Sequence, residues 1–118
     1  MCFSLMYSKI WTNMSNFQDE LDLITVAIKT HTTPESIYLF GSHANGQTGT
    51  DSDIDIYVVV PDSEVDTIEL NAKICLDLAQ KKTRPLDLLI GRKSTFENRK
   101  NRLTLENIIA SEGVKIYG

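Results

Sequence analysis

Segments with helical spacing of apolar residues alternate along the chain with segments that have strand spacing. In residues 15–33 the apolar side chains are four and three positions apart, which predicts a helix with one buried face formed by Phe17, Leu21, Ile24 and Ile28. Pro34 sets the end of this helix, because the residue before a proline is driven out of the helical conformation. Residues 36–40 are β-branched or aromatic and stop at Gly41, which predicts a short buried strand.

The middle of the chain predicts a second strand followed by a second helix. Apolar residues alternate through residues 54–60, which is the period of a strand, and Pro61 ends the run. The segment 63–66 resembles a capping box and predicts the start of a helix. We expect the buried face of this helix to be its apolar stripe, Val65, Ile68, Ala72, Cys75, Leu76 and Ala79. Lys81 and Lys82 then fall in its last turn, where cations suit the helix dipole.

The last third of the chain predicts one more strand and a mainly helical end. Residues 86–90 form an apolar run that stops at Gly91. A second capping-box-like segment, 94–97, opens a helical stretch that reaches Glu112, and Gly113 is placed to cap it. The order helix, strand, turn, strand, helix, strand, helix predicts a small α/β layer fold.

Composition fits one soluble domain. The chain has 118 residues, 42% of them hydrophobic and 24% charged, so there is enough apolar material for a core. We expect residues 1–13 to be a flexible extension and residues 14–118 to be the domain. No apolar run approaches the roughly 18 residues that span a bilayer, so no membrane partner is expected. Cys2 and Cys75 lack metal or redox spacing and are interpreted as free thiols of a reducing, cytoplasmic compartment.

Charge is unevenly distributed. The net charge of −4 argues against direct binding of nucleic acid as a main role. Residues 51–69 hold seven acids and no base, whereas residues 81–102 hold eight of the twelve bases. Two interpretations remain open. The segments are two solvated faces, or they are a cation-binding centre beside a surface that attracts phosphate or a protein partner.

Three aspartates predict a metal centre. Asp53 and Asp55 stand two positions apart at the start of a strand, so their carboxylates project from one face. Like charges this close repel each other and need a cation, and Mg²⁺ is the cation that carboxylates and phosphates share. Asp87 is the one acid inside an apolar strand. If that strand lies beside residues 54–60, the three aspartates can hold two Mg²⁺ ions for displacement at phosphorus.

Gly41 and Ser42 predict a phosphate cradle. A strand that runs into glycine and a small hydroxyl residue leaves backbone N–H groups free to bind phosphate. Glycine permits close approach of the backbone, and the Ser42 hydroxyl can donate a hydrogen bond to a phosphate oxygen.

These motifs resemble a known family. Gly41-Ser42, ten residues, then Asp53-Ile54-Asp55 is similar to the signature of the DNA polymerase beta-like nucleotidyltransferases, and the surrounding residues resemble its short members, the minimal nucleotidyltransferases. The resemblance extends over residues 20–117, and Asp87 falls where the family places its third carboxylate. It implies a nucleotidyltransferase fold, which is a small mixed sheet flanked by helices. It also implies two Mg²⁺ ions on the three aspartates, and nucleotide binding by Gly41, Ser42 and His43.

One position departs from the family. An arginine usually follows the serine, whereas this chain has His43. A neutral imidazole holds phosphate less strongly than a guanidinium group. Either the grip on the triphosphate is weaker, or this is a surface variation without effect.

The resemblance implies a function and a partner. Minimal nucleotidyltransferases are antitoxins that transfer AMP from ATP to a tyrosine of a HEPN-domain RNase toxin and release pyrophosphate. A chain without an acceptor-binding domain suits a protein acceptor and a hetero-oligomer, which the basic stretch 81–102 could contact. Two alternatives stay open: an antitoxin that acts by binding alone, its site idle, and a nucleotidyltransferase for a small molecule that a partner subunit completes.

Overall fold

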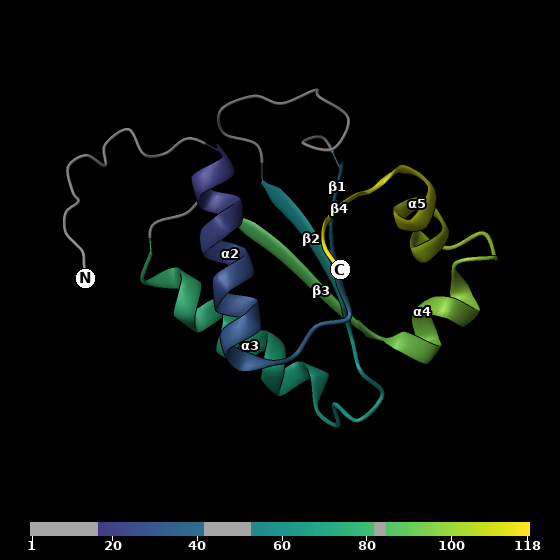
Figure 1. Cartoon of the computed structure of the whole chain (residues 1–118), viewed down its shortest axis with the longest axis horizontal. Coiled ribbons are helices and arrows are strands. Elements are labelled where there is room, and N and C mark those ends of the chain that lie inside the picture. Colours follow the sequence, from purple (N-terminus) through teal and green to yellow (C-terminus); the bar gives the residue numbers. More distant parts are fainter. Residues whose placement is uncertain (1–16, 42–52, 82–84) are drawn as a thin grey trace.

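The computed structural model describes residues 17–41, 53–81 and 85–118 (Figure 1). Its elements follow the predicted order with two differences: the last predicted helix is divided in two, and a fourth strand follows it. The predicted extension 1–13, Ser42, His43 and Lys82 lie outside the described residues. The helices are α2 (Phe17–His31), α3 (Thr67–Ala79), α4 (Lys93–Arg99) and α5 (Leu105–Glu112), and the strands are β1 (Ser36–Phe40), β2 (Ile54–Val60), β3 (Leu86–Arg92) and β4 (Val114–Tyr117).

The sheet is mixed, and its strand order is β3-β2-β1-β4. β1 runs antiparallel to both β2 and β4, whereas β2 and β3 are parallel. This confirms the predicted mixed sheet flanked by helices. The edge strand β4 was not predicted, because four residues are too few to show a period. It exists through its pairing with β1.

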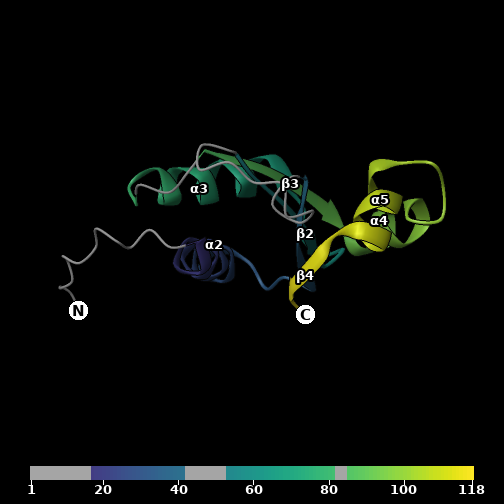
Figure 2. The ribbon, with the colours of Figure 1, turned by 90° about the horizontal axis from the view of Figure 1, so that it is seen from above.

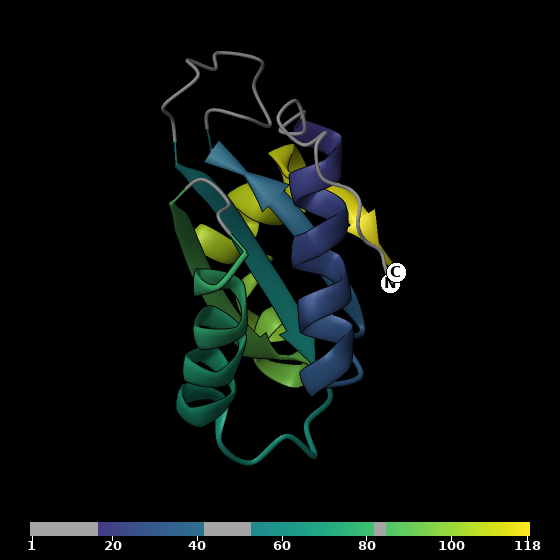
Figure 3. The same ribbon diagram turned by 90° about the vertical axis from the view of Figure 1, so that its left-hand side faces the viewer.

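The sheet is covered on both faces (Figures 2 and 3). On one face α2 and α3 pack over the larger core, which includes every second residue of β2, namely Ile54, Ile56, Val58 and Val60. On the other face α4 and α5 pack over a smaller cluster, in which Tyr57 and Val59 of β2 contact Phe96 and Ile109. β2 is therefore a central strand that is buried on both sides, which explains its long apolar run.

The helix predicted over residues 15–33 is confirmed as α2 within the described residues, from Phe17 to His31, and its predicted start at residue 15 lies outside them. In α2 the buried residues are Glu20, Leu21, Ile24, Ala27 and Ile28. Phe17 packs against the same core from the first turn. The helix ends at His31, before Pro34, as expected.

The predicted buried face of α3 is wrong. Its buried residues are Leu70, Ile74 and Leu78, whereas Ile68 and Leu76 of the predicted stripe are 83% and 68% exposed. The helix has two apolar faces, and the spacing alone does not say which one meets the sheet. Within the predicted stripe, Cys75 does pack against the core, from a half-buried position.

Three predicted boundaries also shift. α3 starts after Asp66, whose carboxylate accepts a hydrogen bond from the Glu69 N–H at 2.9 Å, and it ends before Lys81. β3 continues through Gly91 to Arg92, because both residues keep pairing with β2.

The predicted terminal helical stretch is two helices, and only its end is as expected. α4 has no cap from its own N-cap residue, Arg92, and its Ser94 N–H donates to the Asp62 carboxylate at 2.9 Å. Thr104 caps α5, and Gly113 ends it as predicted.

Candidate active site

The parallel pairing of β2 and β3 brings two of the predicted site residues together. Asp55 stands directly opposite Asp87 in the register, and neighbouring strands lie roughly 4.8 Å apart. Residues in register point to the same face, which is the face covered further along by α4 and α5. Asp53 comes directly before β2. The condition on which the sequence prediction rested, that the two acidic strands are neighbours, is met.

All three aspartates reach solvent. Asp53 and Asp87 are exposed and Asp55 is half-buried. The side chains of Asp53 and Asp87 make no hydrogen bond or ion pair with another residue of the described ranges. Their oxygen atoms are therefore available to a cation or to a substrate that enters from solvent.

Gly41 lies against the carboxylate of Asp55. It follows β1 directly, has a φ of +77°, and a Cβ placed on it would collide with Oδ2 of Asp55. Positive φ and the absence of a side chain are both properties that glycine supplies at least cost. The structure thus brings the glycine of the predicted phosphate cradle and the second aspartate of the motif into contact. Ser42 and His43, which the sequence places beside them, are outside the described residues.

The residues fit Mg²⁺ by the chemistry of their donors, without forming a closed cage. Among residues 17–41, 53–81 and 85–118, no three histidine, cysteine, aspartate or glutamate side chains are close enough to hold a metal ion. Carboxylates repel one another in the absence of a cation. Mg²⁺ typically takes one or two carboxylates and completes its shell with water and substrate phosphates, and the solvent-facing pair Asp55 and Asp87 suits that mode. The ligand set of three aspartates stays a prediction.

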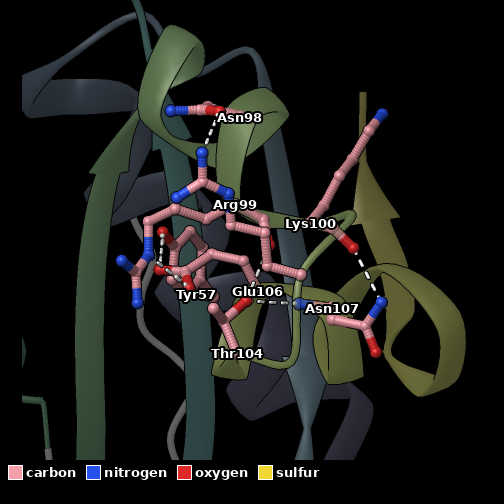
Figure 4. Close-up of polar contacts among 8 residues, drawn as sticks. Tyr57, Asn98, Arg99, Lys100, Thr104, Glu106 and Asn107 are labelled. Carbon is pink, nitrogen blue, oxygen red and sulfur yellow. Dashed lines mark hydrogen bonds and ion pairs between the residues drawn. The ribbon is translucent and has the colours of Figure 1, made fainter.

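A polar network around the buried Glu106 lies one step further along the same face of β2 (Figure 4). The Tyr57 hydroxyl donates to Oε2 of Glu106 at 3.1 Å, and Nε of Arg99 donates to Oε1 at 3.0 Å. Gly91 of β3 makes room for the Tyr57 hydroxyl, since a Cβ there would collide with it. The network ties α4 and α5 to the strand that carries Asp55.

The network sets two pKa values. Burial, together with the negative charge of Glu106, raises the pKa of Tyr57, so its hydroxyl stays protonated as a donor. Burial alone would raise the pKa of Glu106, but the hydrogen bonds from Arg99 and Tyr57 outweigh it and lower that pKa. Sequence reasoning missed this network. A glutamate in the first turn of a helix is common, so it does not indicate a network, and only the fold shows that Glu106 is buried.

The chain belongs to a nucleotidyltransferase family. The family model described as "Polymerase beta, Nucleotidyltransferase" matches residues 22–118, which is most of the chain. The resemblance inferred from Gly41, Asp53 and Asp55 is thereby confirmed at the level of the family. A search of the curated proteins finds no match.

Two solved structures share the fold. One is a toxin–antitoxin crystal structure with AMP-PNP, which is 22% identical over 82% of this chain and 72% of its own, with a TM-score of 0.59. The other is a mutant of the toxin–antitoxin MntA-HpeT, which is 20% identical over 84% of this chain and 72% of its own, with a TM-score of 0.56. At this identity the likeness establishes the nucleotidyltransferase fold.

Within the described residues, no helix is both long and apolar enough to cross a membrane.

Proposed function

We propose that this chain is a Mg²⁺-dependent nucleotidyltransferase that acts as a cytoplasmic antitoxin. It transfers AMP from ATP to a tyrosine hydroxyl of a HEPN-domain RNase toxin. The observation that carries the proposal is the register of β2 and β3, which sets Asp55 beside Asp87 while the Asp55 carboxylate rests on Gly41. Carboxylates next to a glycine turn are what transfer at phosphorus requires: cation ligands beside a backbone that a phosphate can approach.

Each residue has a role in this proposal. Asp53, Asp55 and Asp87 would hold Mg²⁺, which when bound would neutralise charge on the triphosphate and lower the pKa of the acceptor hydroxyl. Ser42, His43 and the backbone around Gly41 hold the triphosphate oxygens. Asp87 accepts the proton as the tyrosine oxygen bonds to the α-phosphorus, and the bond from that phosphorus to the bridging oxygen breaks and releases pyrophosphate. Most of the rate enhancement comes from holding the two reactants in line and neutralising their charge.

The two solved structures support a toxin as the partner and a nucleotide as the substrate. Both are toxin–antitoxin structures, one contains the ATP analogue AMP-PNP, and the other replaces two aspartates that stand two positions apart with glutamate. Asp53 and Asp55 have the same spacing. The exposure of Asp53 and Asp87 leaves both carboxylates open to a substrate, as transfer requires. Binding without catalysis and transfer to a small molecule are the outcomes that compete with this function.

The test is labelling of the partner. Purified chain, labelled ATP, Mg²⁺ and the HEPN-domain protein from the neighbouring gene are expected to give a protein labelled on tyrosine. Asp53→Ala and Asp55→Ala are expected to lower the labelling rate at least about a hundredfold, because each removes charge stabilisation from the reacting phosphate. Asp22→Ala, which removes an exposed acid of α2, is the matched control and should label like the parent.

The outcomes separate the candidates. If the Asp53→Ala, Asp55→Ala double variant labels as well as the parent, the assigned metal site is wrong. If the parent neutralises the toxin without labelling it, the protein acts by binding alone. Label that appears on a small molecule, and not on the partner protein, would favour the nucleotidyltransferase for a small molecule.

A further inference from the structure

α3 presents a second apolar face to solvent. We define the outer stripe as Ile68, Ala72, Leu76 and Ala79, which recur at intervals of four, four and three residues, so they form one line along the helix. All four are exposed, although the opposite face of α3 already supplies the core with Leu70, Ile74 and Leu78. No other described element covers this outer side (Figure 3). A surface helix normally turns charged residues outward, so the outer stripe calls for a partner.

A groove continues the outer stripe onto the sheet. It has a volume of about 460 Å³ and lies between α3 and the edge strand β3, lined by Thr67, Ile68, Asn71, Ala72, Leu89 and Ile90. Asn71 Nδ2 donates to the Leu88 carbonyl of β3 at 2.8 Å. That bond occupies an acceptor that an added β-strand would need. The groove is therefore suited to side chains from a helix rather than to an extended strand.

The groove reaches the candidate active site along β3. Leu89 and Asp87 are two positions apart on the same strand, so their side chains point to one face, roughly 7 Å from each other. Both are exposed. This face is the opposite one from the face on which α3 packs, but β3 is an edge strand. A partner that lies in the groove and passes around that edge, over Leu89, therefore reaches the face that carries Asp87 and Asp55.

We infer that the outer stripe and this groove dock an apolar helix of the acceptor protein and so bring its hydroxyl to Asp87. The inference rests on the proposed function. Ala72 and Ala79 allow a close approach of helix backbones, and Ile68 and Leu76 are the knobs that enter the partner.

Charge favours a foreign helix over a second copy of this chain. The exposed acids Asp66 and Asp87 border the surface at the start of α3 and along β3, whereas the charge of Glu69 is paired with Lys73 at 3.3 Å. Two copies would bring these acids against each other, whereas a partner helix flanked by lysine or arginine complements them.

The test is an Ile68→Glu, Leu76→Glu double variant of the full chain. Both side chains are largely exposed, so thermal stability should stay near that of the parent. The affinity for the purified HEPN-domain protein is expected to fall at least about tenfold, and labelling at limiting partner should fall with it. Binding of Mg²⁺-ATP to the chain alone should not change. Leu103→Glu, which places the same charge at a fully exposed leucine between α4 and α5, should match the parent in every measurement.

Each result decides for or against the docking surface. If the double variant binds the partner and labels it like the parent, the inference is wrong and the proposed function stands. If the parent never labels the partner but the double variant loses binding, the proposed catalysis fails and the docking surface stands. If the parent sediments as a dimer that the double variant breaks while partner binding is kept, a second copy occupies the surface and the inference is overturned.

Discussion

Gly41 and Asp55 show how the site depends on single residues. The positive φ of Gly41 turns the chain out of β1, and its missing side chain leaves the space in which the Asp55 carboxylate lies. The glycine of the motif is thus needed twice, for its backbone conformation and for the room that it leaves to a proposed metal ligand.

Gly41→Ala should therefore damage the site more than the fold. A side chain at positive φ costs about 1–2 kcal/mol of the free energy of unfolding. The added methyl group also forces the Asp55 carboxylate to move. We expect a loss of labelling comparable to that of Asp55→Ala, together with a modestly lower melting temperature, measured on the same preparation. Labelling at the parental rate would show that the contact of Asp55 with Gly41 is not needed.

At the scale of elements, α3 is the most informative segment. One face of this helix packs in the core, and another carries an apolar stripe that is exposed to solvent. The helix also has its N-cap at Asp66, three residues after Ser63, where the sequence predicts it. The later start arises because the chain between β2 and α3 is held by the fold. Arg92 donates to the carbonyls of Glu64 and Val65 at 2.7 and 2.8 Å, which keeps that segment outside the helix.

Two substitutions distinguish the predicted helix start from the observed one. Asp66→Ala removes the hydrogen bond to the Glu69 N–H and should lower the free energy of unfolding by about 1 kcal/mol. Ser63→Ala is the matched control and should leave it unchanged, because Ser63 lies exposed before the cap. Urea denaturation of both variants measures this difference. A larger loss from Ser63→Ala would move the start of α3 back to the predicted position.

For the whole molecule, the network of Tyr57, Arg99 and Glu106 joins the sheet to the layer formed by α4 and α5, on the side of the candidate site. Because the pKa of Glu106 is lowered in the folded state, its carboxylate stabilises the fold fully above the unfolded value near 4.5. That contribution is lost as the pH falls through the lower folded pKa. The pKa values of Asp77 and Glu97 are also lowered, chiefly by hydrogen bonds from Lys81 and Lys100, so acid should destabilise the parent.

Glu106→Gln isolates the contribution of the buried Glu106 carboxylate to this loss of stability in acid. The variant should lose about 1 kcal/mol of unfolding free energy at neutral pH, because an amide replaces a charged acceptor. Between about pH 5 and about pH 3, the free energy of unfolding of the variant should then fall less than that of the parent. Urea titrations across this range measure both effects. Glu112→Gln, at an exposed position near the end of α5, should keep the slope of the parent, and an equal slope for Glu106→Gln would contradict the role given to Glu106.

Much of the fold and part of the site were determined by local patterns in the sequence. The apolar spacing of α2, the strand period of β2 and the stops at Pro34, Pro61 and Gly113 are properties of neighbouring residues, and the structure confirms them. The motif of Gly41, Ser42, Asp53 and Asp55 likewise lies within one short segment, which was enough to identify the family.

Only the tertiary structure decided the features that join distant segments. It pairs β4 with β1, chooses which apolar face of α3 is buried, sets Asp87 opposite Asp55, and closes Arg99 and Tyr57 around Glu106. Periodicity describes a segment by itself. Register, burial and buried hydrogen bonds depend on which remote segment lies next to it, and that is settled when the sheet and its two helical layers pack together.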